Sequence, residues 1–449
     1  MNLDRLFLLL YVVAPFLAAV LPTRRVALNG LLSAGSVSSL ARIVLLFALI
    51  PTVISQAGQV MISGTLVNGY PLEFLLSLDA QRFGFLLTAE FCFLLAHWMG
   101  AAPRDNASLV RALLSLAQGF SSLLILSDNS VATGALEMLA GAVFFYLVRF
   151  SLPGGDREVG ASISRRMYVL FFLLGILMIS WGIIEFGLGD LRYAKGTGST
   201  LGLVTWLILL VLAVPLPPWA RWFSQAVEEL PEGVTLALVT FVSAVALKFS
   251  SLFSVVYPDL AWQEKLGLYL LGVIGGLFSL SRLFASESRR KLLGSLPTFF
   301  FSLILISVGV SKTSLSLSAY FVCLFVPVFT GLILYASAMK LSHPLQKAFV
   351  ALLFAVTVGL PGTPVFMIFS RIGARSLDMG ASYTLAFGVL WFLYFFANVF
   401  ICRRLFMENP TPRSVAATQL DGASAAYAGY GLFLIIFVVV ITQLAGRIL

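Results

Sequence analysis

Several ionisable residues occur within or at the start of long apolar runs of this sequence, and five of them are candidates for chemistry. Glu90, Glu137 and Lys248 lie inside such runs, and Arg165 and Arg166 open another. A charge near the centre of a bilayer costs about 2.5–3.5 kcal/mol even on the most permissive insertion scale, so each one needs a partner or a function. Burial moves the pKa values of carboxylates and amines toward neutrality, which suits them to exchange protons. The sequence therefore offers candidate proton-binding groups within a membrane.

Glu137 and Lys248 are the strongest of these candidates. Glu137 lies one turn into the apolar segment Val131–Phe150. It would be a proton-exchanging carboxylate or, alternatively, a water-exposed acid at a helix start. Lys248 has apolar neighbours on both sides, so it would be a buried proton carrier or a lysine that extends to the interface near Tyr257.

The other charged residues have weaker sequence support. Glu90 has no evident partner, and would either pair with a basic group on another helix or face a cavity. Arg165 and Arg166 would approach Glu137 or only anchor the inner end of their helix. His97 ends its apolar run beside Trp98, which favours an interfacial position.

The composition defines the elements that must position these residues. The chain has 449 residues, of which 59% are hydrophobic and 11% are charged. Soluble domains carry about 25% charged residues, so a soluble globular domain, a disordered chain and a nucleic-acid-binding module are excluded. The net charge of +9 is an ordinary excess for a membrane protein with Lys and Arg in its cytoplasmic loops.

About fourteen segments are long enough to cross a membrane, since a spanning helix needs about 20 mostly apolar residues. They are 5–22, 40–56, 81–100, 110–127, 133–150, 167–187, 200–216, 234–256, 265–284, 294–311, 316–339, 345–370, 383–406 and 424–447. The connections are short, and the longest outer stretch is Gln56–Ala80. The first segment lacks a basic start and a cleavage site, so we expect a retained helix.

Lysine and arginine are distributed unevenly over the loops. With both termini outside, nineteen of them lie at the inner loops and nine at the outer loops and termini. Positive charge favours the cytoplasmic side, so we expect a multi-pass protein of the inner (cytoplasmic) membrane with both ends outside.

Two of the expected helices contain sequences that interrupt them. Proline removes a backbone donor and clashes with the preceding turn, which breaks a helix at Pro215, Pro217 and Pro218, and again at Pro361, Gly362 and Pro364. The two breaks are five helices apart. They predict an N-terminal region with helices 1–3 over residues 1–107, two five-helix repeats over residues 108–258 and 259–407, and a C-terminal helix within residues 408–449.

Cofactor chemistry has little support in the sequence. The three cysteines, Cys92, Cys323 and Cys402, form no metal-ligand cluster, and only two histidines are present. We expect no cofactor, no metal site and no active site for bond-making chemistry.

Several motifs resemble the antiporter-like membrane subunits of respiratory complex I, Mrp-type antiporters and membrane hydrogenases. Leu78-Asp79 resembles the start of the family's helix 3, and Ser127-Asp128-Asn129 with Glu137 resembles its helix 5. Pro218-Trp219-Ala220-Arg221-Trp222, with Pro231 nine residues further on, resembles the break after helix 7. The sequence 289–295 resembles the segment after helix 9, and Gly359-Leu360-Pro361-Gly362-Thr363 resembles the helix-12 break of the M-type subunit.

The resemblance implies an all-α polytopic fold with two inverted five-helix repeats and broken helices 7 and 12. It also implies a helix-5 glutamate, here Glu137, paired with a helix-7 lysine, and a helix-8 base leading to a helix-12 lysine or acid. This sequence departs from that pattern. Ala213 occupies the helix-7 position, Phe369 occupies the helix-12 position, and Lys248 falls about one turn later than the helix-8 base.

We therefore expect a subunit of a complex-I-related assembly that takes part in proton or cation translocation, or a divergent one that keeps the fold and a partial site. Its partners would be other membrane subunits, the lipid bilayer, and protons or Na⁺. Any quinone or NADH dehydrogenase chemistry would reside on partner chains. The alternative is the membrane subunit of a two-component inorganic-carbon uptake system with a carbonic-anhydrase-like partner. A membrane enzyme acting on lipid-linked sugars is disfavoured, because the longest outer stretch offers only Glu73 and Asp79.

Overall fold

The computed structural model describes most of the first 402 residues. The described residues are 3–20, 33–54, 60–65, 73–99, 106–152, 157–186, 199–216, 221–257, 261–286, 289–311, 317–338, 352–353, 355–361 and 363–402. The predicted last span, 424–447, lies outside them, as does the start of the predicted span 345–370.

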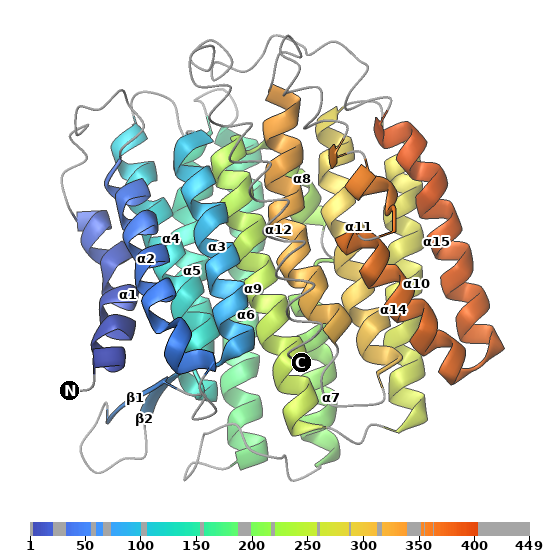
Figure 1. Cartoon of the computed structure of the whole chain (residues 1–449), viewed down its shortest axis with the longest axis horizontal. Helices are drawn as coiled ribbons and strands as arrows, with labels where there is room; N and C mark the ends of the chain where they lie inside the picture. The colour runs from blue at the N-terminus through green and yellow to red at the C-terminus, as the bar shows by residue number, and fades with distance from the viewer. Residues whose placement is uncertain are drawn as a thin grey trace. The chain divides into compact units, whose positions relative to one another are not determined.

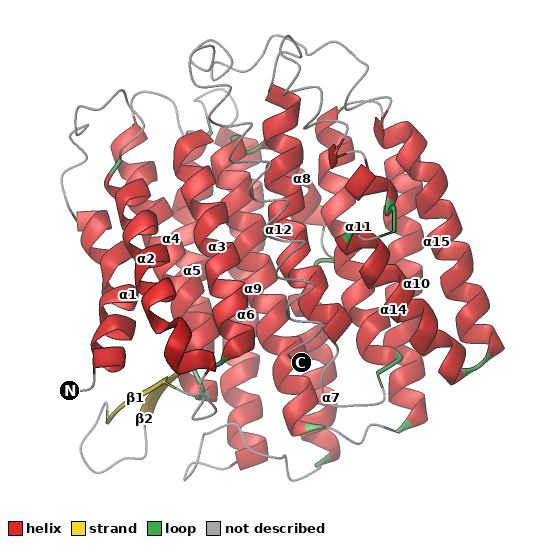
Figure 2. Ribbon diagram, viewed as in Figure 1, coloured by secondary structure: helices red, strands yellow, loops and turns green. Residues whose placement is uncertain are grey.

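Helices dominate the described chain, and its two strands form a single hairpin (Figures 1 and 2). The first helices and the hairpin are α1 (Leu3–Val20), α2 (Ala34–Ile54), β1 (Val60–Thr65), β2 (Glu73–Leu78), α3 (Ala80–Met99), α4 (Ala107–Leu126), α5 (Ser130–Ser151) and α6 (Arg157–Phe186). The remaining helices are α7 (Thr200–Ala213), α8 (Arg221–Glu229), α9 (Glu232–Val256), α10 (Trp262–Phe284), α11 (Arg289–Gly309), α12 (Leu317–Ala338), α14 (Pro364–Met379) and α15 (Ala381–Cys402).

Nine helices in the described regions of the chain are long and apolar enough to cross a membrane. The prediction of an all-α polytopic membrane protein is therefore confirmed. Helix α3 is not among the nine, because Arg82, Glu90 and His97 lower its hydropathy. Its central residues Gly84–Ala96 are nevertheless buried against other helices, so protein rather than lipid surrounds Glu90.

The chain divides into two compact units. Unit 1 contains α1–α7, the hairpin and α9, and unit 2 contains α10, α11, α12, α14 and α15. The chain passes from one unit to the other between Val214 and Pro215, at the first predicted helix break, and returns between Glu228 and Glu229 within α8. Within unit 1, helix α9 packs directly on α3, α4, α5 and α7.

Both predicted helix breaks are present. Helix α7 ends at Ala213, and the following residues up to Leu216, Pro215 among them, are not helical. In the second break, Gly359 has a φ of 76°, a left-handed conformation that favours glycine, and Thr363 caps the new helix α14 that begins at Pro364. Pro217, Pro218 and Gly362 lie outside the described residues.

The hairpin is a feature that we did not expect within the outer stretch Gln56–Ala80. Strands β1 and β2 pair antiparallel with Val60 opposite Leu78. A local signal is present in the sequence, because Asn68-Gly69 stands between two apolar runs and such dipeptides are typical of hairpin turns. The hairpin matters for function because Leu76 of β2 also forms a bridge to Ser127 between α4 and α5.

Candidate functional site

The turn between α4 and α5 is fixed by its own polar side chains. Asn129 caps α5 by accepting hydrogen bonds from the backbone N–H groups of Val131 and Ala132, at 2.9 and 3.2 Å. The Ser127 and Thr133 hydroxyls are 2.8 Å apart. These contacts hold the Ser127 carbonyl and the Asp128 carboxylate in defined positions.

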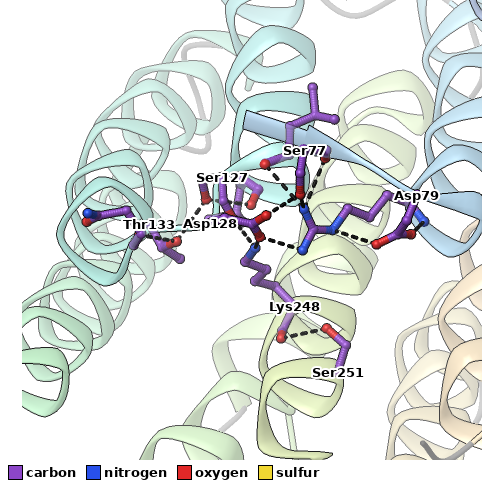
Figure 3. A network of polar contacts seen from close by, with 11 residues as sticks. Ser77, Asp79, Ser127, Asp128, Thr133, Lys248 and Ser251 are labelled. Carbon is purple, nitrogen blue, oxygen red and sulfur yellow. Dashed lines mark hydrogen bonds and ion pairs between the residues drawn. The ribbon is translucent and has the colours of Figure 1, made fainter. Parts of the chain in front are cut away.

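Lys248 of α9 reaches this turn from within the protein. Its ammonium donates a hydrogen bond to the Ser127 carbonyl and lies 3.9 Å from Asp128 Oδ1 (Figure 3). Lys248 is only 2% exposed. The ammonium thus contacts protein oxygen atoms at the α4–α5 turn, and both sequence-based interpretations of Lys248, a buried proton carrier and a lysine that extends to the interface near Tyr257, stay predictions.

Arg82 links the same carboxylate to the hairpin and to the start of α3. Its guanidinium donates to Asp128 Oδ1 at 2.5 Å and to the Ser77 carbonyl at 3.0 Å, and it forms an ion pair with Asp79 at 3.3 Å. Asp79 also accepts a hydrogen bond from the Arg82 backbone N–H and so caps α3. The side chains of Asp79, Arg82 and Asp128 are 36%, 20% and 18% exposed, so the network opens toward solvent at this end.

Opposing influences act on the Asp128 carboxyl. Burial alone would raise its pKa, but the Lys248 ammonium and the Arg82 guanidinium, together with hydrogen bonds from Arg82 and Ser77, hold the pKa of Asp128 below its usual value. Asp128 is therefore a stable anion between two cations.

Glu137 lies deeper, two turns into α5, and is fully buried. Neither carboxylate oxygen has a hydrogen-bond partner among the described residues, and Lys248 is the charged group that acts on it. The alternative of a water-exposed acid at a helix start is therefore wrong, because the helix begins at Ser130, earlier than the predicted residue 133. We name the set Ser77, Asp79, Arg82, Ser127, Asp128, Glu137 and Lys248 the Lys248 site.

Arg165 and Arg166 are exposed on α6. Gly134 faces Gly175 and Gly141 faces Phe171, so Glu137 is level with residues 171–175 of α6. Arg166 is at least five residues from that level, about 7.5 Å along the helix axis. The prediction that the two arginines open their helix is wrong, because α6 begins at Arg157 and they lie exposed about two turns inside it, away from the level of Glu137.

Glu90 belongs to a second buried group, and of its two predicted environments pairing with a base on another helix is confirmed. It forms an ion pair with Arg42 of α2 at 2.9 Å, and both side chains are fully buried. Glu90 also accepts hydrogen bonds from Tyr11 at 2.8 Å and from Gln118 at 2.6 Å. We name the set Tyr11, Ser39, Arg42, Glu90, Gln118 and Ser122 the Arg42 cluster.

Unit 2 presents a different core at the position where the resemblance placed an ionisable group. Phe369 of α14 is fully buried and stacks with Tyr394 at 5.2 Å between ring centroids. Phe299 of α11 also stacks with Tyr394, at 4.7 Å between ring centroids. Arg371, close by in sequence, places its guanidinium 4.9 Å from the Phe321 ring centroid instead.

Some members of the Lys248 site could be read from the sequence and others could not. Asp79 and Asp128 stood in the motifs that carried the resemblance, but their roles as partners of Arg82 and Lys248 need the hairpin and the packing of α3 on α9. Arg42 was missed entirely, because the predicted span began at Leu40 whereas α2 begins at Ala34 and carries Arg42 in its interior.

Comparisons with solved structures identify proteins that share the fold of this chain. No protein-family profile matches the chain, and no curated protein sequence matches it significantly. A chain in the structure of the Mrp complex from Dietzia sp. DQ12-45-1b superimposes with a TM-score of 0.78 at 14% identity, over 100% of this chain and 96% of that one.

Two respiratory assemblies contain similar chains. One is the membrane-bound sulfane sulfur reductase, an archaeal respiratory membrane complex, with a TM-score of 0.76 at 14% identity over 96% of this chain and 76% of that one. The other is respiratory complex I from Thermus thermophilus, with a TM-score of 0.70 at 17% identity over 97% of each chain. The protein therefore has the fold of antiporter-like membrane subunits, as the motifs predicted.

Proposed function

We propose that this protein is an antiporter-like integral membrane subunit of a multi-subunit complex related to complex I, and that it takes part in proton translocation through the Lys248 site. The observation that carries the proposal is the position of Lys248. Its buried ammonium lies 3.9 Å from the partly exposed, ionised Asp128, and it is the charged group that acts on the buried Glu137, which lacks hydrogen-bond partners among the described residues. The shared fold of the Mrp and respiratory chains supports the assignment to a membrane complex.

In this proposal a proton moves between the Glu137 carboxylate and the Lys248 amine, since burial in general brings the proton affinities of acids and amines closer together. Asp128 and Arg82 connect Lys248 to the membrane surface beside the hairpin. Asp128 attracts the Lys248 ammonium, whereas the Arg82 guanidinium, which bonds to the same carboxylate, repels it.

The remaining elements of the assignment follow the charge distribution. We place the chain in the inner (cytoplasmic) membrane with both termini outside, in contact with lipid and with other membrane subunits. A carboxylate and an amine bind and release protons directly, so the proton is the proposed ion. Na⁺ is the alternative ion, and replacing sodium by choline in the assay would reveal its transport. No observation on the described residues favours the inorganic-carbon alternative.

The test is proton flux across vesicles that contain the full chain with its co-purifying subunits. A positioned acid or base contributes about 10²–10⁴-fold to a proton-transfer step, so we expect Glu137→Gln and Lys248→Met each to lower the flux about 100-fold. Glu185→Gln is the matched control, because Glu185 is another buried carboxylate of unit 1. It accepts a hydrogen bond from the Ser199 hydroxyl at 2.6 Å. Normal flux with Glu137→Gln would overturn the proposal.

A further inference from the structure

The Arg42 cluster joins four helices around a buried ion pair. Tyr11 lies on α1, Ser39 and Arg42 lie on α2, Glu90 lies on α3, and Gln118 and Ser122 lie on α4. A pair of this kind contributes little net stability compared with apolar residues of the same volume, because desolvation of the charges offsets their attraction. Its presence inside a membrane protein therefore calls for a role beyond holding the helices together.

The cluster is built so that Glu90 can lose its charge. Arg42 has two contacts that do not involve Glu90: it donates to the Ser122 hydroxyl at 2.5 Å, and its guanidinium lies 4.0 Å from the Tyr11 ring centroid. A cation–π contact and a hydrogen bond keep a guanidinium partnered when the carboxylate is protonated. The Tyr11 hydroxyl, 3.4 Å from Ser122, can in turn accept a hydrogen bond from the protonated acid.

Polar groups extend from the cluster to the end of α3. Gln118 uses both amide hydrogens, one toward Glu90 and one toward Ser39 at 2.8 Å, which leaves its Oε1 without a partner in the described chain. The neighbouring His97 has two buried ring nitrogens that also lack hydrogen-bond partners among those residues. The Gln118 side chain lies near the His97 ring. His97 lies seven residues after Glu90, so both side chains stand on one face of α3 about 10 Å apart.

The start of α2 leaves space for this histidine. A Cβ atom at Gly35 would come within 2.2 Å of His97 Cε1, so only glycine fits there without displacing the ring. His97 stands near the end of α3 with both ring nitrogens buried in protein, and its interfacial position stays a prediction.

In the other direction the cluster lies next to the Lys248 site. Ser122 precedes Asp128 by six residues, about 9 Å along α4. Helices α3 and α4 both pack on α9, which carries Lys248. The charged and titratable groups that contact Glu90 are thus Tyr11 and Arg42, and Arg111 of α4 acts on His97.

We propose that Glu90 in the Arg42 cluster is a second proton-binding site, through which protons pass between the His97 end of α3 and the Lys248 site. This inference rests on the proposed function, and names the route on the side of the membrane opposite to the hairpin. A proton taken up at the His97 end neutralises Glu90 while Arg42 stays a cation, and it then crosses to Glu137 and Lys248 on water. The whole route lies within unit 1, and does not need the ionisable group that Phe369 replaces.

The test combines single and double variants of the full chain, reconstituted with its co-purifying subunits. Glu90→Gln leaves Arg42 without its anion and destabilises the protein, so the decisive variant is Glu90→Gln with Arg42→Gln, which removes both charges and keeps the side chains similar in size. We expect the double variant to unfold at nearly the wild-type temperature and to carry protons about 100-fold more slowly. Glu90→Asp, which keeps a carboxylate at this position, should retain part of the flux that the double variant loses.

A second readout separates proton transfer from packing. We expect His97→Ala to lower the flux about tenfold and added imidazole to restore it, because free imidazole can occupy the space and carry the proton. Imidazole should not rescue the double variant. Wild-type flux in the double variant, with Glu137→Gln inactive, would overturn this inference and leave the proposed function intact. Wild-type flux in Glu137→Gln would overturn both.

Discussion

The two units of this protein place very different side chains in their cores. Five charged residues are buried in the regions of the chain that the structure describes, and all five belong to unit 1: Arg42, Glu90, Glu137, Glu185 and Lys248. The corresponding region of unit 2 around Phe369 is a stack of aromatic rings from α11, α14 and α15. Unit 1 buries charged side chains, whereas the described core of unit 2 around Phe369 is apolar.

This difference indicates how the fold can be kept while one of its units loses its charges. The break before α14 remains, with Gly359 left-handed and Thr363 as a cap, although no buried charge follows it among the described residues. The helix break of unit 2 is therefore present although none of the described residues beside it is a buried charge. In the proposed function, the proton-binding groups are therefore those of unit 1.

The largest effect on stability is expected at Lys248. Lys248→Met removes the cation from among Asp128, Glu137 and the Ser127 carbonyl, and loss of one partner from a buried ionic set costs about 3–5 kcal/mol. We expect a lower unfolding temperature in mild detergent together with the loss of proton flux. An unfolding temperature equal to that of the wild type would mean that Lys248 is not buried among these groups.

A charge introduced into unit 2 tests the contrast from the other side. Phe369→Glu inserts a carboxylate into the aromatic stack, with an expected loss of about 2.5–3.5 kcal/mol. The control Phe369→Leu keeps the site apolar and should cost about 1.5 kcal/mol or less, with normal proton flux. If Phe369→Leu stopped proton transport, the restriction of transport to unit 1 would be wrong.

A smaller effect, dependent on pH, is expected at Asp128. Its pKa in the folded protein is lowered, so its stabilising contribution is fully present above the unfolded value near 3.9 and is lost as the pH falls through the lower folded value. Asp128→Asn should remove about 1.5–3 kcal/mol at neutral pH, the usual range for hydrogen bonds to charged groups. Unfolding temperatures of both proteins, measured from pH 7 down to about 3, should differ by a constant amount above about pH 4 and approach each other below it.

The smallest effect is expected at the cap of α5. Asn129→Ala removes a side chain that accepts two backbone hydrogen bonds, which costs about 1 kcal/mol. Because Asn129 is not itself a proton carrier, flux should fall by less than about threefold, in line with a modest displacement of the Ser127 carbonyl. A loss as large as that of Lys248→Met would show that the turn takes part in proton transfer directly.

The sequence predicted the fold and the two central ionisable residues, for physical reasons that are easy to state. Apolar runs of spanning length are visible without any structure, and a single charge inside such a run, such as Glu137 or Lys248, stands out. The helix breaks could be predicted because proline and glycine act locally. The substitution at Phe369 followed from the motif alignment alone.

The partners of these residues could not be predicted. Arg42 follows a segment rich in serine and glycine, which hydropathy assigns to a loop but which packs inside the protein as the first two turns of α2. Arg82 and Glu90 lie on one helix, yet one bonds to Asp128 and the other to Arg42, since the face that each side chain presents depends on the packing of α3. Such pairs are set by tertiary contacts between residues far apart in sequence.

The central claim is that Glu137 exchanges a proton with its surroundings inside unit 1. Infrared difference spectra of the reconstituted protein, recorded across a pH titration, detect the C=O stretch of a protonated carboxylic acid directly. We expect a buried carboxylic-acid band that titrates, disappears in Glu137→Gln and shifts its midpoint in Lys248→Met. A set of titrating bands that is unchanged by Glu137→Gln would contradict the claim.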